Sequence, residues 1–560
     1  MVTPIETNPE LTRLHLQSAS RQPVGWWSPT DEGPTQDPAR IASALMDLRK
    51  NLILVGNPLN PMLACGGWAV LGRDAGREDA LPIVAFSPSL RPEDLGDPTF
   101  LKDHGVQYPY VTGAMANGIA SVEVVEAASR GGMLGFFGSA GLPLETVARA
   151  IDRLQTSLGS SPHGLNLIHS PNEPGLEAQL VDLYLQRGVR RIEASAFMEL
   201  TPAIVRYRVS GLEATPAGVV APRNRVVAKI SRAEVATRFL SPPPERILAE
   251  LLARGQISRQ EASFAGRIAM ADDVTVEADS GGHTDNRPLV ALLPSIIALR
   301  DRLQAQHRFA TPARIGAAGG ISTPASAAAA FAMGAAYVVT GSVNQACVES
   351  GSSDAVRILL AEAGMADIAM APAADMFEMG IKVQVLKRGT MFPMRAAKLF
   401  DIYRSSSSLE TISPPERASL ERDLFRRSLE DVWRETHDFF LARDPAQIER
   451  AQRDPKHKMA LVFRWYLGLS SRWANSGDPT RRLDYQVWCG PAMGAFNEWT
   501  RGSFLEQPAN RRVAIVARNI LHGAAYSLRL SLLRSQGIHL QGVSARAAPL
   551  ESQELDRYLN

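Results

Sequence analysis

Between residues 107 and 365 the chain repeats one pattern eight times, a short apolar run followed by an amphipathic stretch. Typical repeats are MLGFFGSAG followed by LETVARAIDRLQTSLG, and ARIGAAGGI followed by TPASAAAAFAMG. Short apolar runs that alternate with helical patterns predict parallel strands connected by helices. Eight such units have the size of one closed barrel. We therefore predict an α/β fold in which residues 106–365 form a (β/α)8 TIM barrel.

The segments on either side of the barrel lack this rhythm. Residues 1–105 contain one helical stretch and several short apolar runs, which predict a small N-terminal α/β region. Within it, GWWSPTDEGPTQDP predicts turns rather than a packed element, because Pro and Gly are frequent there. Residues 366–560 contain amphipathic stretches, so we predict a helical C-terminal region.

The fifth unit is longer than the others. Residues 231–271 contain about two extra helices around a run of three prolines. Lids and substrate walls of a barrel form where strands lead into helices. We therefore expect a helical insertion after strand five at the catalytic end of the barrel.

Composition excludes several functional classes. The 60 basic and 58 acidic residues leave a net charge of +2, so no overall basic field favours nucleic acid or a membrane surface. No run approaches the roughly 20 apolar residues of a membrane span. The N-terminal residues include acids and lack the apolar core of a signal peptide. The three cysteines lie far apart, which is typical of reduced thiols. We expect a cytoplasmic protein.

Glycines end the last two predicted strands. AAGGIST places Gly319 and Gly320 after strand seven, and VVTGSV places Gly341 and Ser342 after strand eight. Backbone N–H groups beside glycine can approach a phosphate closely, and the loops after strands seven and eight are where barrels bind phosphate. Glycine also ends strands for purely steric reasons, but the pair on neighbouring strands favours a phosphate site.

Lys229 ends the predicted fifth strand, VVAKI, and an ammonium group inside an apolar strand end needs a partner. One candidate is the edge of a flavin ring, which becomes anionic on reduction. The other is a salt bridge to Glu193 or Glu277. The sequence leaves both open.

The turn DSGGHTDNRP follows the predicted sixth strand and contains His283. Metal binding through Asp279, His283 and Asp285 is not favoured, because no second histidine or cysteine lies at ligand spacing. A plain surface turn is the simplest alternative. We favour a third interpretation, in which Gly281 and Gly282 open the approach to a flat ligand and His283 acts on it as an acid, base or hydrogen-bond donor.

EADSGGHTDNRP, together with AAGGIST, MGAAYVVTGSV and AKIS, resembles the 2-nitropropane dioxygenase / nitronate monooxygenase superfamily of FMN barrels. The chain is more similar to a branch of that superfamily, the PfaD-like trans-acting enoyl reductases of polyketide and polyunsaturated fatty acid synthases. VTGAMANGIAS at strand one, the insertion and the segment FEMGIKVQVLKRGTMFPMRAAKLFDIY carry this likeness. The resemblance covers most of the chain from about residue 50.

The resemblance implies roles for individual residues. It makes His283 the catalytic residue, and it places FMN against the backbone of strand one, the flavin-contacting lysine, the paired glycines and the two phosphate loops. Strand one reads Gly-Ala-Met-Ala here, where many relatives have Pro-Met-Ala-Gly. The implied FMN-binding residues are Ala114, Met115, Ala116, Asn166, Lys229, Gly281, Gly282, Gly319, Gly320, Gly341 and Ser342.

The implied activity is an FMN-dependent enoyl reductase that reduces 2-enoyl thioesters on an acyl carrier protein in trans, with NADPH as reductant. His283 would supply a proton or polarise the thioester, with Asp285 tuning it. The chain lacks the G-x-S-x-G nucleophile elbow of an acyltransferase, so we expect a free-standing reductase. It could also form a homo-oligomer.

Two alternatives remain. A nitronate monooxygenase would use the same FMN and histidine with oxygen as acceptor, and a scaffold protein of a synthase would have lost turnover. The insertion and the C-terminal region favour the reductase, because a small nitronate needs no docking surface. Lys229, His283 and both phosphate loops disfavour the scaffold. The basic and aromatic residues expected to bind an acidic carrier protein are Arg464, Trp465, Arg472 and Trp473.

Overall fold

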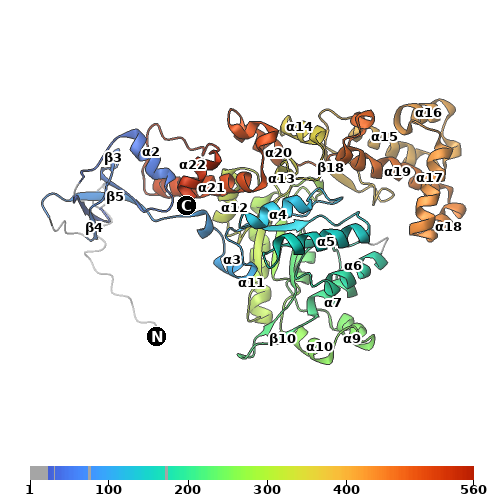
Figure 1. Ribbon diagram of the computed structural model, residues 1–560, viewed down its shortest axis with the longest axis horizontal. Coiled ribbons are helices and arrows are strands. Elements are labelled where there is room, and N and C mark those ends of the chain that lie inside the picture. The colour runs from blue at the N-terminus through green and yellow to red at the C-terminus, as the bar shows by residue number, and fades with distance from the viewer. Residues whose placement is uncertain (1–22, 31, 73–76, 171–173, 560) are drawn as a thin grey trace, which may run out of the picture. The chain divides into compact units, whose positions relative to one another are not determined.

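The computed structural model describes residues 23–30, 32–72, 77–170 and 174–559 (Figure 1). The chain divides into two compact units. The first takes its residues from Met1–Arg91, Ala525–Ala547 and Asp556–Asn560, and the second from Pro92–Ala524 and Ala548–Leu555. The predicted division at residues 105 and 365 stays a prediction. No helix in the described part of the chain is long and apolar enough to cross a membrane.

The first unit contains helix α2 (Pro38–Met46) and an antiparallel sheet in the order β3-β2-β5-β1-β4. The prediction of turns at GWWS is wrong, because these residues form β1, and Trp27 is buried against Val55 and Ile83. Aromatic side chains favour strands with one buried face, and this outweighs the nearby Pro and Gly. The strands are β1 (Gly25–Ser28), β2 (Leu52–Asn57), β3 (Asn60–Leu63), β4 (Trp68–Leu71) and β5 (Leu81–Ser87).

The second unit contains the predicted barrel, which is confirmed. Its eight strands are parallel and close in the order β12-β13-β15-β16-β6-β7-β8-β9. Their residues are nearly all buried, as expected for a sheet covered on both faces. The strands are β6 (Tyr110–Thr112), β7 (Leu134–Phe137), β8 (Gly164–Ile168), β9 (Arg191–Ser195), β12 (Arg225–Ile230), β13 (Asp273–Glu277), β15 (Arg314–Ala318) and β16 (Val338–Thr340).

Helices connect these strands around the outside of the barrel (Figure 1). Several begin with a side-chain cap: Ser121 accepts from the amide of Val124, and Thr323 forms a capping box with Ser326. A further helix, α3 (Pro98–His104), precedes the first strand. The connecting helices are α4 (Val122–Arg130), α5 (Leu144–Leu158), α6 (Pro174–Gln186), α7 (Pro202–Val209), α8 (Ala233–Phe239), α11 (Leu289–His307) and α12 (Pro324–Ala332), and α13 (Ser342–Gln345) and α14 (Asp354–Ala361) follow the last strand.

The helical insertion after strand five is present, but its expected position at the catalytic end is wrong. It forms α9 (Glu245–Ala253) and α10 (Arg259–Ala265). The carboxylate of Glu261 in α10 accepts from the amide of Gly211, which follows α7 and therefore lies at the N-terminal ends of the strands. Figure 1 shows α9 and α10 beside β10 (Glu213–Ala214), at the end of the barrel opposite β18 (Lys382–Leu386).

The C-terminal region is helical as predicted, but it also supplies two strands. β17 (Ile368–Pro372) and β18 form an antiparallel hairpin, and β18 pairs with β14 (Gly282–His283) from the barrel. The helices that follow are α15 (Phe392–Ser405), α16 (Pro414–Ser419), the π-helix η3 (Leu420–Phe425), α17 (Leu429–Arg443), α18 (Pro445–Arg453), α19 (Pro455–Ser476), α20 (Ala492–Thr500), α21 (Val513–Ser535) and α22 (Ser552–Leu559).

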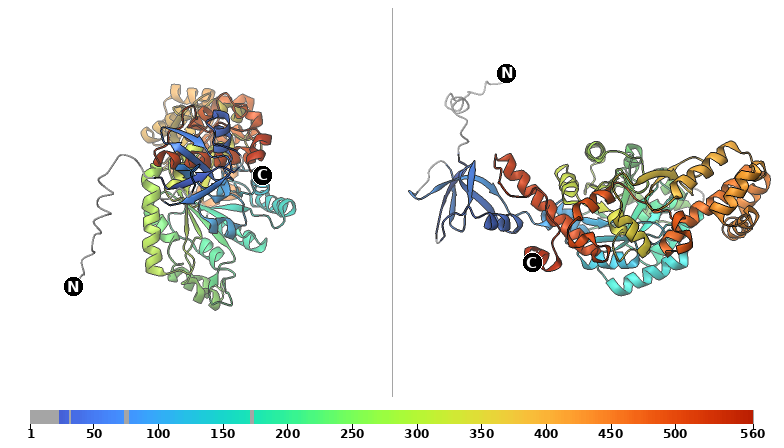
Figure 2. Two further views of the ribbon diagram at one scale, coloured as in Figure 1. Left: turned by 90° about the vertical axis from the view of Figure 1, so that its left-hand side faces the viewer. Right: turned by 90° about the horizontal axis from the view of Figure 1, so that it is seen from above.

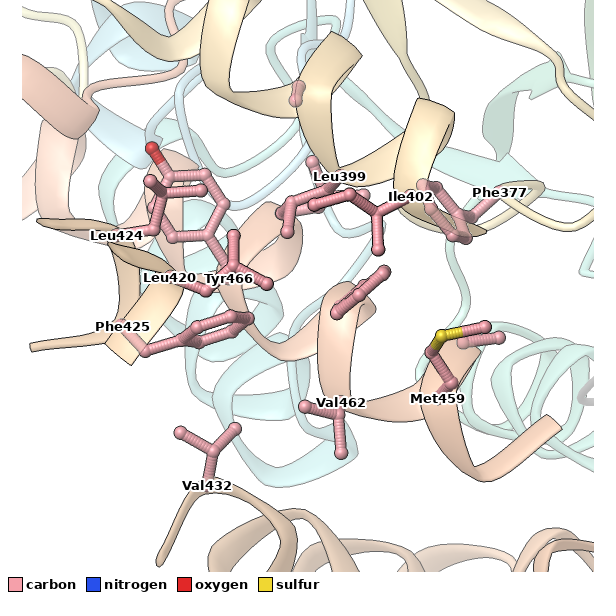
Figure 3. Close-up of a cluster of buried hydrophobic side chains, with 14 of the residues drawn as sticks. Phe377, Leu399, Ile402, Leu420, Leu424, Phe425, Val432, Met459, Val462 and Tyr466 are labelled. Atoms are coloured by element: carbon pink, nitrogen blue, oxygen red, sulfur yellow. The ribbon is translucent and has the colours of Figure 1, made fainter. Parts of the chain in front are cut away.

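The helices from α15 to α19 pack around a core of their own. Figure 2 shows them, in orange, to one side of the barrel. α19 runs through this core and contributes buried residues along its length. Figure 3 shows side chains from α15, η3, α17 and α19 that meet there, among them Leu399, Ile402, Leu424, Phe425, Val432, Met459, Val462 and Tyr466.

Candidate active site at the C-terminal strand ends

A buried carboxylate holds the loop after the first barrel strand. Glu193 of β9 is fully buried, and its Oε2 accepts from the amide of Ala114 at 2.8 Å. Its other oxygen, Oε1, has no hydrogen-bond partner among the described residues. Burial raises the pKa of Glu193 to about 7, although the nearby Lys229 opposes this shift. Such a carboxylate can exchange a proton near neutral pH.

Lys229, predicted to contact either a flavin or a glutamate, forms an ion pair with Glu277. Its Nζ lies 3.0 Å from Glu277 Oε1, across neighbouring strands β12 and β13. Burial lowers the pKa of Lys229, but Glu277 and Glu193 outweigh burial and raise it above its ordinary value. The ammonium group therefore stays charged at the C-terminal end of β12, and the ion pair uses only one of its three protons.

Asn166 connects two strands. Its side-chain amide donates to the backbone oxygen of Glu193 at 2.9 Å and to Ser195 Oγ at 3.0 Å. Both acceptors belong to β9, so the amide group fixes β8 against its neighbour. This role accounts for the buried polar side chain, and the flavin contact of Asn166 stays a prediction.

The half-buried residues Ala114, Met115 and Ala116 form a closely packed loop. The oxygen of Met115 accepts from the amide of Ala120 at 3.2 Å. A Cβ atom on Gly138 would lie 1.7 Å from that same oxygen, so only glycine fits at the end of the second strand. The loop therefore presents a fixed backbone to whatever binds above the barrel.

The glycines of the two loops differ in the space around them. Gly319 has φ +80°, and a Cβ there would lie 2.6 Å from the carbonyl carbon of Ala278. Gly320 also has a positive φ, +75°, but among the described residues no atom lies within 4 Å of a Cβ built on Gly320 or Gly341. Steric fit thus explains Gly319, whereas the space beside Gly320 and Gly341 leaves room for a ligand.

Sequence reasoning missed a serine in the first of these loops. Ser322 is fully buried, and its Oγ has no hydrogen-bond partner among the described residues. A buried hydroxyl of this kind indicates a site that binds polar groups, because buried polar atoms are nearly always paired. The signal was present in AAGGIST, where the serine directly follows the glycines and one apolar residue.

Polar side chains of the DSGGHTDNRP turn mostly hold the turn itself. Thr284 Oγ1 accepts from the amides of Ser280 and Asn286. Gln384 of β18 donates to Asp279 Oδ1 and to the oxygen of Ser280, both at 2.8 Å. Asn286 also donates to Asp279 Oδ1, at 2.8 Å. The turn is therefore fixed by the C-terminal region as well as by its own residues.

The paired glycines of this turn also meet the C-terminal region. A Cβ on Gly281 would lie 2.8 Å from the backbone nitrogen of Cys489, so close packing against that segment requires glycine. Gly282 has φ +80°, and a Cβ built on it would lie 3.9 Å from Cγ of Trp488. The amide of Gly490 reaches Ser342 Oγ at 3.3 Å. Contact of these glycines with a flat ligand stays a prediction.

His283 and Asp285 have different partners from those expected. Nε2 of His283 lies 3.3 Å from Oδ1 of Asp375, which belongs to the loop between β17 and β18. Asp285 instead accepts from two guanidinium nitrogens of Arg232 and from Ser231, which lowers its pKa to about 2. The expectation that Asp285 tunes His283 is therefore not met, because its carboxylate binds Arg232 and Ser231 instead.

The three residues considered as metal ligands do not converge. Asp279 binds Gln384 and Asn286, whereas His283 and Asp285 have the separate partners described above. Among the residues that the structure describes, no three His, Cys, Asp or Glu side chains gather as a metal site requires.

Three of the four residues proposed to dock a carrier protein have other roles. Trp465 and Trp473 pack against the helical core, and Arg481 stacks on Trp473 at 4.3 Å. Arg464 pairs with Glu378 at 3.6 Å. Only Arg472 is exposed. The predicted basic and aromatic surface is thus mostly core packing, because the two tryptophans lie on the face of α19 that packs against the helical core.

Comparison with known proteins assigns the barrel to a family. Residues 98–406, more than half of the chain, match the family model described as nitronate monooxygenase. Residues 406–485 match the model of the inserted helical domain of acyl-carrier-protein S-malonyltransferase. This second match covers the helices from α16 to α19.

The names of the relatives refer to polyunsaturated fatty acid synthases and to polyketide biosynthesis. The chain is 50% identical to a polyunsaturated fatty acid synthase subunit of Thraustochytrium sp. over 79% of this chain and 30% of that protein. It is 46% identical to the polyketide biosynthesis protein PksE of Bacillus subtilis, over 78% of this chain and 57% of PksE. The chain thus spans between about a quarter and a little over half of its curated relatives.

A solved structure matches almost along its full length. The enoyl reductase domain of MlnA, from the macrolactin biosynthesis cluster of Bacillus amyloliquefaciens, is 40% identical with a TM-score of 0.75. The match covers 79% of this chain and 99% of that domain. The resemblance predicted from the DSGGHTDNRP turn is confirmed, and the chain belongs to the nitronate monooxygenase family, where it is similar to the enoyl reductase domain of MlnA.

Proposed function

We propose that this chain is an FMN-dependent enoyl reductase that reduces 2-enoyl thioesters on an acyl carrier protein, with NADPH as reductant. The observation that carries the proposal is the likeness to the enoyl reductase domain of MlnA over 99% of that domain. Names of other relatives, which are polyunsaturated fatty acid synthase and polyketide biosynthesis proteins, support the same substrate class.

The strand ends fit FMN. The open space beside Gly320 and Gly341 would admit its phosphate, and the unpaired hydroxyl of Ser322 offers a donor there. Lys229 would place a fixed positive charge at the ring edge that becomes anionic on reduction. When bound, FMN would take hydride from NADPH and supply it to the β-carbon of the enoyl thioester.

The chain's own residues would then position the substrate and move the proton. His283 would donate a proton to the α-carbon or a hydrogen bond to the thioester oxygen. Lys229 and Glu277 would stay an ion pair throughout, which keeps their strand ends fixed. Glu193 would hold the strand-one backbone through the amide of Ala114.

Action in trans and a cytoplasmic location belong to the same proposal. The match of residues 406–485 to a helical domain of an acyl-carrier-protein S-malonyltransferase supports a carrier protein as partner. The three cysteines are free thiols, which supports a reducing compartment.

A nitronate monooxygenase is the second candidate, because the matching family model has that description. The two functions differ in their acceptors. We would load purified protein with FMN, exclude oxygen, and add NADPH with crotonyl-loaded carrier protein. The reductase predicts stoichiometric formation of the butyryl product. A second, aerated sample would receive a nitronate in place of these substrates. Oxygen consumption there, with no NADPH-driven reduction of crotonyl groups in the first sample, would assign the chain to the monooxygenase instead.

A further inference from the structure

The carboxylate beside His283 comes from nearly a hundred residues further along the chain. β14 pairs with β18, so that His283 lies opposite Val383 and Gly282 opposite Gln384. This register brings the loop between β17 and β18 alongside the imidazole, where Asp375 Oδ1 lies 3.3 Å from Nε2. Gln384 reinforces the register through its bonds to Asp279 and Ser280. Backbone pairing thus fixes His283, and the β17–β18 hairpin brings the loop with Asp375 to it.

We propose that Asp375 is the positioning residue of His283: it accepts from Nε2–H and so leaves Nδ1 to deliver the proton to the substrate. This inference rests on the proposed enoyl reduction. A carboxylate at one imidazole nitrogen fixes the tautomer of the neutral ring and stabilises the charged ring. Asp375 itself does not contact substrate in this scheme.

The proton balance is simple. Hydride adds to the β-carbon of the C=C bond, and the protonated ring of His283 gives its Nδ1 proton to the α-carbon. Two C–H bonds replace the π bond, the ring becomes neutral, and water restores its proton before the next turnover. The ring must therefore be charged when the acyl group arrives, and Asp375 favours that state.

Charges around the pair act in the same direction. Burial lowers the pKa of His283, but Asp375 and the more distant Glu277 of β13 outweigh it and raise the pKa above 6.5. Burial raises the pKa of Asp375, but His283 and Arg464 of α19 lower it overall. On β18 the residue opposite His283 is Val383, which is uncharged. Both side chains of the pair are about half exposed, so solvent screens these effects.

Asp285 offers a matched control. It lies two residues from His283 in the same turn, but its carboxylate binds Arg232 and Ser231. If any carboxylate in this region could tune the imidazole, replacing either aspartate would have similar effects. If the 3.3 Å contact is responsible, only Asp375 matters.

The test uses the 560-residue chain loaded with FMN and the variants Asp375→Asn, Asp375→Glu and Asp285→Asn. The first readout is the pH dependence of His283 modification by diethyl pyrocarbonate, followed on its peptide by mass spectrometry. The second is the pH profile of re-oxidation of NADPH-reduced enzyme by crotonyl-CoA. We expect Asp375→Asn to lower the His283 pKa in the first readout. The same variant should move the alkaline limb of the re-oxidation profile by the same amount and slow re-oxidation about tenfold at pH 8. Asp375→Glu should restore most of the His283 pKa and of the re-oxidation rate, and Asp285→Asn should change neither quantity.

Unchanged pH profiles in Asp375→Asn, with active parent enzyme, would overturn the inference and leave the proposed function standing. Equal effects of Asp285→Asn would also overturn it. A parent enzyme that never reduces crotonyl groups would overturn the proposed function. The modification profile would then still decide whether Asp375 sets the His283 pKa.

Discussion

The backbone of Cys489 occupies the space that a side chain on Gly281 would need. A Cβ on Gly281 would lie 2.8 Å from the nitrogen and 3.0 Å from the Cα of Cys489, and a Cβ on Gly490 would lie 2.9 Å from the nitrogen of Gly281. Two glycines in segments about 200 residues apart thus allow a backbone-to-backbone contact. This contact joins the turn that bears His283 to the segment whose Gly490 donates to Ser342 Oγ.

Gly281→Ala should therefore loosen the segment around Cys489. Overpacking of this kind costs about 1–3 kcal/mol. We expect a melting temperature several degrees lower and faster hydrogen exchange at the amide of Cys489, which donates to Gln384 at 3.3 Å. Gly341→Ala is the control, because no atom of the described residues lies within 4 Å of its new Cβ and its φ is −125°. An alanine tolerated equally at both positions would contradict the tight contact.

Gly341→Glu should weaken FMN binding without unfolding the protein. The site has room for the side chain, so the fold should persist. A carboxylate near a phosphate repels it by about 4 kcal/mol at 4 Å and an effective dielectric constant of 20. We expect at least about 100-fold weaker FMN binding in a flavin fluorescence titration. Gly266→Glu is the control, since Gly266 is equally open but follows α10 at the other end of the barrel. Equal FMN affinity in both variants would show that the phosphate of FMN does not bind beside Gly341.

The sequence predicts the barrel well because the two periodicities are local. Each strand end, including Lys229 and His283, follows from an apolar run that stops at a polar residue. Partners that arrive from distant segments have no such local signal. Gln384 reaches the site because β18 pairs with β14, Asp375 lies in the loop that leads to β18, and the amide of Cys489 donates to Gln384. The register of such pairing is set by the whole fold.

Strand β18 and the position of the insertion were both missed, but the sequence carried a signal for only one of them. IKVQVLK alternates apolar and polar residues, which favours a strand, and the structure has β18 there. The position of the insertion had no signal, because a helical pattern after strand five does not state which end of the barrel it packs against. Glu261 decides this through its bond to the amide of Gly211, a contact over 50 residues.

Glu193→Gln should change how stability depends on pH. The folded protein raises the pKa of Glu193 from 4.5 to about 7, so it binds this proton more tightly than the unfolded chain. The resulting stabilisation is fully present below pH 4.5 and is lost as pH rises through about 7, on the order of 3 kcal/mol in total. As the pH rises from 5 to 8, the melting temperature of the variant should therefore rise relative to that of the parent.

Glu261→Gln provides the opposite sign for comparison. Burial raises the pKa of Glu261, but hydrogen bonds from the amides of Ser258 and Gly211 lower it overall. Its stabilisation is present above its ordinary pKa and is lost as pH falls, so this variant should show no gain between pH 5 and 8. A flat difference between parent and Glu193→Gln would show that Glu193 is ionised throughout.

His283→Ala should separate the two halves of the proposed reaction. Because the imidazole is about half exposed and pairs with Asp375, its loss should leave FMN binding and reduction by NADPH intact. Re-oxidation by crotonyl-CoA should slow by about 100-fold or more, the size expected of a positioned acid. Stopped-flow absorbance measures both steps on one sample. Near-normal re-oxidation would give His283 a structural role.

A carrier protein should accelerate the reaction of the acyl group that it bears. We expect a crotonyl group on a carrier protein to be reduced faster than the same group on a small thiol. Carrier proteins are typically acidic, and contacts between exposed charges are screened within roughly 8–10 Å at physiological ionic strength. Added salt should therefore raise KM for the carrier-bound substrate and leave kcat nearly unchanged.

Arg472 is the residue through which this can be tested. It is exposed on α19 next to Ser471, whose Oγ accepts from Asn117 of the strand-one loop at 3.2 Å, so it lies at the C-terminal end of the barrel. Arg472→Glu should raise KM for crotonyl-loaded carrier protein about tenfold and leave KM for the small thioester unchanged. Arg259→Glu is the control, because Arg259 is exposed on α10 at the opposite end. A reversed result, with only Arg259→Glu weakening the carrier-bound reaction, would place the carrier protein at the other end of the barrel. There the acyl group could not reach His283, so the proposed use of that histidine would fail with it.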